Sequence, residues 1–241
     1  MLIAAAVCPQ TPLLVPQIAA GAADELAEVR KAAIAAVGQL CAALPDRVIT
    51  VAPGGLPGAR EVRFGGSFRG FGVDLAVGDG PHAQDGRGDA RCTGLLVGSW
   101  LLNGHVTRAD VPFEGWEIGE DTDPEHCARI GHQLAARAER VGLLVMGDGS
   151  ACRTLKAPGY LDDRAVPFDN EVSRALADAD TAALAAIDPT AASDLMAAGR
   201  APWQVLAGAV DGSGAPWRGE LLSYHAPYGV GYFTASWAPR N

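Results

Sequence analysis

The sequence predicts an α/β protein: a three-layer α/β/α single domain around a central, mostly parallel or mixed sheet. Short apolar runs rich in β-branched residues alternate along the chain with longer segments of helical periodicity. Runs that are apolar at every position need cover on both faces, which helices provide when they flank a sheet. With 241 residues, 49% of them hydrophobic, the chain is long enough to bury one large core, so we expect a single domain over 1–241.

The first half of the chain opens with a strand, a helix and a second strand. We expect a buried strand at 2–7 and then a helix of about 20 residues near 26–44, where apolar residues recur at three- and four-residue steps. Cys41 falls on that apolar stripe. A β-branched run at 48–52 ends in Pro53-Gly54-Gly55 and predicts the second strand.

The next segment, 54–90, is rich in glycine and contains three phenylalanines. It predicts a hairpin, a strand near 73–77 and a mobile loop at 78–89. A helix is expected at about 91–104. Asp123 followed by Pro124 is typical of a helix start and opens another expected helix.

The last third begins after a predicted buried strand at 142–146. Asp188-Pro189 and Pro202 mark expected helix starts and Gly199 an expected helix stop, which together predict three short helices between about 168 and 211. Two strand-like runs, 220–224 and 230–237, close the chain.

Composition excludes several classes of function. The formal charge is −9 and no Lys/Arg cluster occurs, so we expect no nucleic-acid partner. No 18-residue apolar span is present, and the six-residue apolar run at the N-terminus lacks a basic flank, so we expect a cytoplasmic protein without a membrane partner. The five cysteines show no C-x-x-C spacing and are expected to be reduced thiols.

Three segments resemble one known family. They are CPQTPLLVP at 8–16, GDGSACRTLKAPGYLDDRAVPFD at 147–169 and YGVGYFTASW at 228–237. In this order and spacing they are similar to the catalytic subunit (LigB-like) family of class III extradiol ring-cleavage dioxygenases, and to an actinobacterial branch of about this length. The resemblance covers the chain end to end and implies the same α/β/α fold.

The resemblance implies a metal site that this sequence has lost. Active members cleave catechol-type rings with a non-haem Fe(II) held by two histidines and a glutamate, and use a further histidine as acid/base. At the positions of the two ligand histidines this chain has Gln10 and Gly54, and at the acid/base position it has Ala151 or Cys152. Glutamine is a weak iron ligand and glycine offers none, so we expect no cofactor and a protein inactive in ring cleavage.

Two further family positions are also altered or unplaced. A histidine expected in an Asp-His-Gly-type segment would fall near 89–92, where none occurs. The carboxylate ligand has no clear counterpart, with Glu220 as the nearest acidic candidate and His225 as the nearest imidazole. The CPQTPLLVP segment is therefore interpreted as a vacated metal loop.

Polar groups after the central strands are the remaining candidates for a ligand site. Asp148, Ser150, Arg153 and Lys156 follow the strand at 142–146, where α/β proteins usually bind ligands, although capping and turn roles remain open. Cys8 and Cys152, with His225, form a candidate thiol pair for a soft metal or for nucleophilic chemistry, against the alternative of simple packing. The candidate ligand-binding set is Cys8, Gln10, Asp148, Ser150, Arg153 and His225.

The other histidines lack ligand-like spacing. His126 and His132 are expected on the exposed side of a helix, and His82 and His105 in loops or at a helix end. Should the family alignment be displaced, His82, His105 or His225 would be the metal ligands of an active enzyme.

The sequence leaves different classes of function open. The first is a dioxygenase-like protein that is inactive in ring cleavage and binds a small molecule in the pocket that holds the substrate in active members of the family. The second is a non-enzymatic interaction or scaffold protein on the same fold, and the third is an active metal-dependent dioxygenase that uses other ligands. We also expect a homodimer, because Phe113, Trp116 and the segment 64–72 offer apolar groups beyond the needs of one core.

Overall fold

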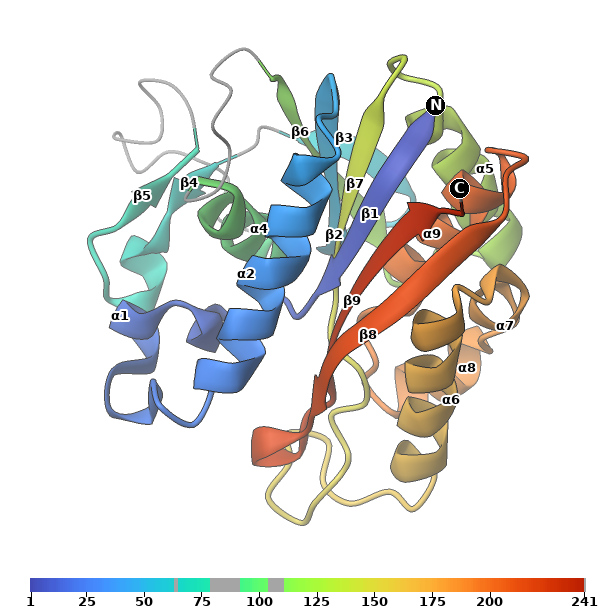
Figure 1. Cartoon of the computed structure of the whole chain (residues 1–241). Helices are drawn as coiled ribbons and strands as arrows, with labels where there is room; N and C mark the ends of the chain where they lie inside the picture. The colour runs from blue at the N-terminus through green and yellow to red at the C-terminus, as the bar shows by residue number, and fades with distance from the viewer. Residues whose placement is uncertain (63–64, 79–91, 104–110, 241) are drawn as a thin grey trace.

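The computed structural model describes residues 1–62, 65–78, 92–103 and 111–240. Helices cover both faces of a seven-stranded mixed sheet, which gives the predicted three layers (Figure 1). The strands, in their spatial order, are β3 (Ala59–Val62), β6 (Phe113–Gly119), β2 (Arg47–Gly54), β7 (Val141–Met146), β1 (Leu2–Cys8), β9 (Tyr232–Pro239) and β8 (Trp217–His225).

The middle of the sheet is parallel and deeply buried. β6, β2, β7 and β1 run parallel to their neighbours, whereas β3, β9 and β8 pair antiparallel at the two sides. Every residue of β7 is buried, because helices cover both of its faces. The three predicted strands at 2–7, 48–52 and 143–146 are confirmed as β1, β2 and β7, which are adjacent in the sheet.

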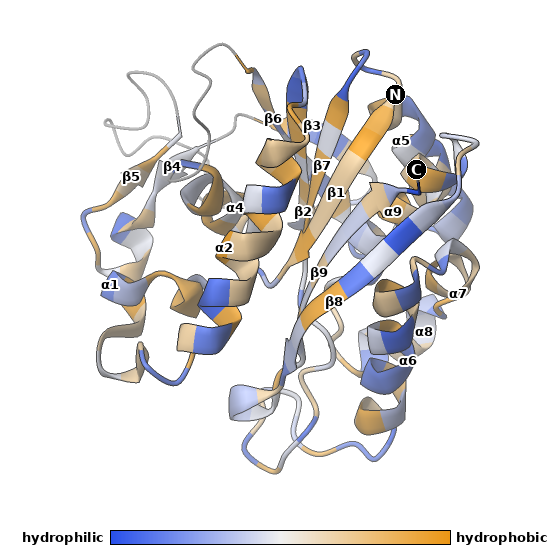
Figure 2. Ribbon diagram, viewed as in Figure 1, coloured by the Kyte–Doolittle hydropathy of each residue, from blue (hydrophilic) through white to orange (hydrophobic). Residues whose placement is uncertain are grey.

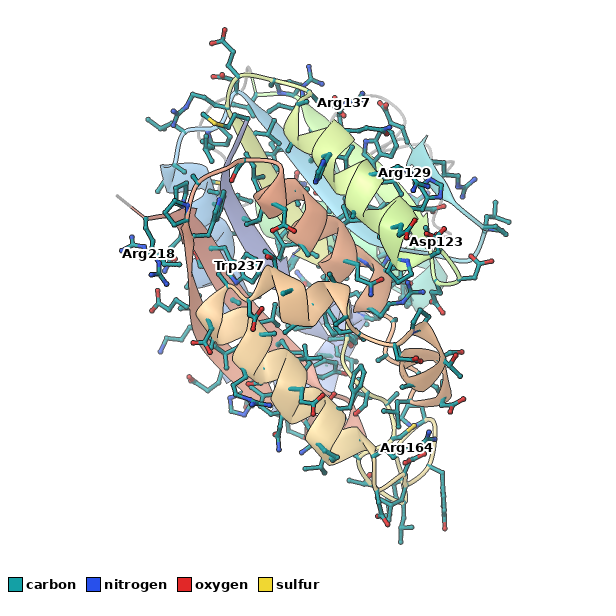
Figure 3. The ribbon with its side chains drawn as sticks, turned by 90° about the vertical axis from the view of Figure 1, so that its right-hand side faces the viewer. Asp123, Arg129, Arg137, Arg164, Arg218 and Trp237 are labelled. Atoms are coloured by element: carbon teal, nitrogen blue, oxygen red, sulfur yellow. The ribbon has the colours of Figure 1, made fainter. Side chains whose placement is uncertain are left out.

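Two hydrophobic clusters fill the spaces between the sheet and its helical layers. Alternate residues of β1 point to opposite faces: Ala5 and Val7 belong to one cluster, and Ala6 and Cys8 to the other. The first face packs against α5 (Pro124–Ala135), α6 (Ala165–Asp178), α7 (Thr181–Ala185) and α9 (Arg200–Asp211), which Figure 3 shows from outside. The second face packs against α2 (Ala27–Ala42) and α4 (Thr93–Asn103). Hydrophobic residues predominate along β1 and β2, while β8 at the sheet edge carries hydrophilic positions (Figure 2).

The helices agree in place with most of the sequence signals. Asp123 caps α5 as predicted, accepting a hydrogen bond from the His126 amide at 2.8 Å, with Pro124 at the first helical position. None of the described helices is both long and apolar enough to cross a membrane. The main helices are α2 (Ala27–Ala42), α4 (Thr93–Asn103), α5 (Pro124–Ala135), α6 (Ala165–Asp178), α7 (Thr181–Ala185), α8 (Pro189–Asp194) and α9 (Arg200–Asp211).

Short elements complete the chain. A two-stranded sheet and several single-turn helices lie in the connections and carry few of the core residues. They are η1 (Pro12–Leu14), α1 (Pro16–Ala19), η2 (Ala20–Ala22), β4 (Gly66–Ser67), η3 (Phe68–Phe71), β5 (Ala76–Val77) and η4 (Pro227–Gly229).

The structure corrects several element predictions. The strand expected near 73–77 is only β5, two residues long, and the predicted loop at 78–89 lies outside the described residues from 79 onward. Four helices, not three, lie between 165 and 211. Gly199 is the N-cap of α9 and does not end a helix. Its Cα packs so closely against Gly147 that a side chain on Gly147 would have no room.

The strand β6 was not predicted, and it changes the interpretation of its aromatic residues. Its parallel pairing with β2 runs from Phe113 opposite Val48 to Gly119 opposite Gly54. Phe113 and Trp116 are half-buried and pack against the two clusters, with the Arg137 guanidinium over the Trp116 ring. Phe68 is fully buried as well. Much of the apolar surface expected to form a dimer contact thus belongs to the core, and the homodimer stays a prediction.

Candidate functional site

The parallel strands bring their carboxyl ends to one edge of the sheet, which is the usual place for a ligand in such folds. The loops after the adjacent strands β1 and β7 are joined there by two hydrogen bonds. The Gly147 amide donates to the Cys8 carbonyl at 3.0 Å, and the Gln10 amide donates to Asp148 Oδ1 at 2.9 Å. These bonds fix the Asp148 side chain between the two loops.

Asp148 is the most perturbed carboxyl group of this edge. Burial raises its pKa to about 7, an effect that the hydrogen bond from the Gln10 amide only partly offsets. Its second oxygen, Oδ2, has no hydrogen-bond partner among the described residues. A half-buried carboxyl that changes charge near neutral pH is a candidate for ligand binding or proton transfer.

Tyr232 and Thr11 stand beside this carboxyl. Tyr232 is buried on β9, and burial together with the nearby Asp148 charge raises its pKa to about 12, while a hydrogen bond with the Thr11 side chain opposes that shift. The phenol therefore stays protonated at neutral pH and presents a hydroxyl group near Asp148. Thr11 itself caps η1, accepting from the Leu13 amide at 3.4 Å.

A second polar network lies just beyond Asp148 and is centred on Asp169 of α6. Asp169 is completely buried and accepts from the Ser150 amide at 2.8 Å, the Ser150 hydroxyl at 2.9 Å and Arg153 Nη1 at 2.9 Å. Arg153 also donates to the Tyr224 hydroxyl. These mutual bonds engage Ser150 and Nη1 of Arg153, two predicted ligand-binding residues, and tie the loop after β7 to α6 and β8.

The corner expected to hold iron in the family does not fit that metal here. Gly54 is buried at the end of β2, and a Cβ atom at this position would lie 2.8 Å from the Glu117 Cβ. The Glu117 carboxylate is paired with Arg60, whose Nε donates to Oε2 at 2.7 Å. A side chain at 54 has no space, and the Glu117 carboxylate is already paired with Arg60.

The Gln10 side chain is likewise turned toward protein. A Cβ atom on Gly94, in the first turn of α4, would lie 3.0 Å from Gln10 Oε1 and close to Ala52 and Met146. The amide group thus lies under the start of α4. Cys92, which precedes this helix, donates from its thiol to the Pro53 carbonyl at 3.3 Å, so α4 closes the space between Gln10 and Gly54.

The cysteines do not form the candidate thiol pair. The Cys8 thiol is buried against α2, 3.8 Å from the Ala33 carbonyl, whereas the Cys152 thiol lies 3.5 Å from the Leu195 carbonyl in a separate small cluster. Burial raises the pKa of both thiols. Ala151, beside Cys152, is buried and donates its amide to the same Leu195 carbonyl. Both thiols are therefore packing groups.

The remaining predicted residues are exposed or lie outside the described part. His225 is exposed at the end of β8, opposite Tyr232 in the strand register, and Lys156 is exposed in the loop before α6. Glu220 is exposed further back on β8, opposite Ser236, and does not reach the carboxyl edge. His82 and His105 lie outside the described residues. Within the described ranges, no group of three or more His, Cys, Asp or Glu side chains is arranged to hold a metal ion.

Sequence reasoning missed Asp169, Tyr232 and Glu117. Asp169 had a usable signal, since it interrupts an apolar stripe of α6 formed by Ala165, Val172 and Leu176. An acidic residue on the buried side of a helix needs a partner, and Arg153 is that partner. Tyr232 and Glu117 had no local signal, because their roles depend on strand neighbours distant in sequence.

Replacing Asp148 with asparagine should change the pH dependence of stability. Because the folded-state pKa of Asp148 is raised from about 4 to about 7, the folded protein binds the extra proton, and this contribution to stability is lost as pH rises through that window. The introduced asparagine would still accept from the Gln10 amide but carries no charge. We expect Asp148→Asn to match wild type near pH 4 and to exceed it by on the order of 1–4 kcal/mol at pH 8.

Urea unfolding at several pH values between 4 and 8 measures this difference. Asp163→Asn serves as the matched control, because the Asp163 side chain is exposed in the loop before α6. A difference between Asp148→Asn and wild type that stays constant across this pH range would contradict the burial of a titrating carboxyl at this edge.

Comparison with known proteins supports the fold alone. No family model matches the sequence, and no curated protein matches it. Among solved structures, the chain is similar to an uncharacterized protein, JW3007, from Escherichia coli K12, with a TM-score of 0.55. The similarity covers 98% of this chain and 99% of that chain at 14% sequence identity. The whole chain therefore adopts an architecture already seen in a bacterial protein, and its function has to be argued from the site.

Proposed function

We propose that this chain is an extradiol dioxygenase-like protein that no longer cleaves aromatic rings and that binds a small molecule at the carboxyl edge of its sheet. The observation that carries the proposal is the Asp148 carboxyl group. It is half-buried, its pKa is about 7, and Oδ2 has no described partner. A carboxyl held partly out of water costs folding free energy when it is charged, which favours a role in binding over a role in stability.

The chemistry of the edge favours a ligand that donates hydrogen bonds. In its charged form Asp148 only accepts, and in its neutral form it also donates, so a hydroxyl or protonated amine suits Oδ2 at neutral pH. Tyr232 adds a phenol close to the carboxyl, while the Gln10 backbone amide is already donated to Oδ1. Small phenols and catechol-type diols combine an aromatic ring with such donors, and they are the ligand class we assign to this site.

The loss of ring cleavage follows from the residues at the family's ligand positions. Bidentate binding of a diol and activation of O₂ both require an iron with three protein ligands and open positions. Gly54 supplies no donor atom, Glu117 occupies the neighbouring space, and the Gln10 amide is directed under α4. The residues at positions 10 and 54 therefore support a role in binding and do not support an iron-dependent reaction.

The purified protein is expected to leave catechol and protocatechuate intact when Fe(II) and ascorbate are supplied. Oxygen consumption and the absorbance of a yellow ring-opened product measure this, together with the iron content after expression in iron-rich medium. Tight binding of one equivalent of iron with formation of that product would contradict the proposal. It would place the ligands at His82, His105 or His225.

Ring cleavage should also remain absent in the double variant Gln10→His with Gly54→His. The new side chain at 54 would collide with Glu117, and the acid/base position at Ala151 or Cys152 would still be empty. A general acid/base group contributes about 10²–10⁴-fold to such reactions. This variant also serves as a control for adventitious iron chemistry in the assay.

Ligand binding is expected to depend on Asp148. A thermal-shift screen of small phenols, diols and amines without added metal should yield compounds that raise the melting temperature, because ligands specific for the folded state stabilise it. Asp148→Asn should lower the affinity for these compounds by about tenfold, which is the loss expected when a hydrogen bond to a charged group becomes one to a neutral group. Glu139→Gln, an exposed change elsewhere, is the matched control and should leave affinity unaltered.

A scaffold role is the second candidate function, and the packing around α4 favours it. Gly94 and Cys92 fill the space between Gln10 and Gly54, so part of the expected pocket is occupied by the protein itself. A screen in which no compound shifts the melting temperature, or in which Asp148→Asn changes no affinity, would favour the scaffold over the binding protein.

A further inference from the structure

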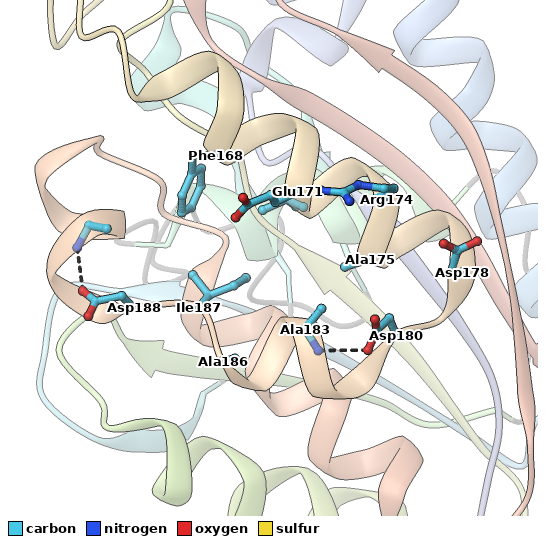
Figure 4. Close-up of a pocket in the computed structure, with 12 residues that line it drawn as sticks. Phe168, Glu171, Arg174, Ala175, Asp178, Asp180, Ala183, Ala186, Ile187 and Asp188 are labelled. Carbon is cyan, nitrogen blue, oxygen red and sulfur yellow. Dashed lines mark hydrogen bonds between the residues drawn. The ribbon is translucent and has the colours of Figure 1, made fainter.

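A surface groove lies between α6 and the α7–α8 segment, on the helical layer formed by α5, α6, α7 and α9 and apart from the residues around Asp148 (Figures 3 and 4). Its volume of about 550 Å³ falls in the range of small-molecule sites, roughly 300–1,000 Å³. Its lining residues are Phe168, Glu171, Val172, Arg174, Ala175, Asp178, Asp180, Ala183, Ala186, Ile187, Asp188 and Ala191.

The floor of the groove is apolar because the facing helices carry small side chains. Alanines predominate on the α7–α8 wall, so the two walls remain apart. Phe168 of α6 and Ile187, between α7 and α8, point toward each other at one end and provide larger apolar surfaces (Figure 4). This floor suits the hydrocarbon part of a ligand.

The rim of the groove is acidic. Glu171 and Asp178 come from α6, and Asp180 and Asp188 from the opposite wall, while Arg174 is the single basic residue of the lining. Asp180 and Asp188 cap α7 and α8, accepting from the Ala183 and Ala191 amides at 2.9 and 2.8 Å. None of these four carboxylates forms an ion pair with any cation in the described part of the chain. Four carboxylates against one guanidinium leave the rim three charges negative.

The geometry points to a linear aliphatic polyamine, and we propose that the groove binds this class of ligand. Glu171 and Asp178 are seven residues apart on one face of α6, which corresponds to about 10.5 Å along the helix. An extended triamine with three- and four-carbon spacers has terminal ammonium groups at a similar separation. Its ammonium groups pair with the rim carboxylates while its methylene segments cover the apolar floor.

Isothermal titration of the full chain with spermidine at low ionic strength tests this proposal. We expect saturable binding with one spermidine per chain, and binding that weakens as salt screens the rim charges. Heptane-1,7-diol, which has the same number of methylene groups but lacks charge, should not bind. The double variant Glu171→Gln with Asp178→Asn removes two rim charges, and neither of these residues caps a helix. It should lower the affinity for spermidine by about tenfold.

Two further variants separate site binding from general attraction to an acidic protein. Glu139→Gln with Asp163→Asn changes the net charge equally on other exposed surfaces and should leave the affinity unchanged. Ala183→Leu fills the groove without altering charge and should also weaken spermidine. The proposal is overturned if spermidine gives no saturable binding, or if the control pair weakens it as much as the rim pair. The groove does not include Asp148, so an absence of spermidine binding would leave the proposed function untouched.

Discussion

The hydrogen bond between the Gln10 amide and the Asp148 carboxylate joins the loops of two adjacent parallel strands, and the arrangement of the carboxyl edge depends on it. The same loop is held on its other side by Gly149, whose amide donates to the Gly231 carbonyl at 2.7 Å. Beyond it, Asp169 anchors Ser150 and Arg153 to α6. Asp148 is thereby fixed in a half-buried position, and burial raises its pKa to about 7. The fixed loops hold the carboxyl group in a position that water reaches only in part.

The polar residues of the edge fall into two groups according to their partners. Ser150 and Arg153 are hydrogen-bonded to Asp169, and these bonds hold the loop after β7 in place. Asp148 keeps an oxygen without a described partner, so it is the group available to a ligand. The loop after β7 therefore forms an ordered frame, while Gly54 and Gln10, where a vacated metal site was expected, are enclosed by protein packing.

Local sequence patterns predicted the central strands and most helices because these depend on short-range hydrophobic periodicity. The fully apolar runs of β1, β2 and β7 could only be buried between helices, and Asp123 with Pro124 marked a helix start directly. The strand β6 escaped prediction because Glu114 and Glu117 interrupt its apolar pattern. Both are buried in ion pairs with Arg47, Arg137 and Arg60, and a pattern based on hydropathy has no means to anticipate those partners.

The candidate site was chosen from the sequence by its place at the ends of the central strands, and the contacts of its residues could be predicted only in part. Asp148 followed from its place after a buried strand, whereas Ser150 and Arg153 were predicted to face a ligand and are instead bound to Asp169. Cys8 and Cys152 both follow central strands, yet a strand alternates its side chains between the faces of the sheet, and the Cys8 thiol turns toward α2. Which polar group remains free is decided by partners far apart in sequence, so it requires the fold.

The pKa of the Asp148 side chain decides whether the carboxyl edge holds a preformed, half-buried acceptor. Carboxyl-detected NMR on protein labelled with ¹³C at aspartate, with Asp148→Asn to assign the resonance, measures it in the folded state. We predict a titration midpoint close to 7 for Asp148, because burial disfavours its charged form. A midpoint near the ordinary value of about 4 would show that the carboxyl is solvated, and would contradict such an acceptor.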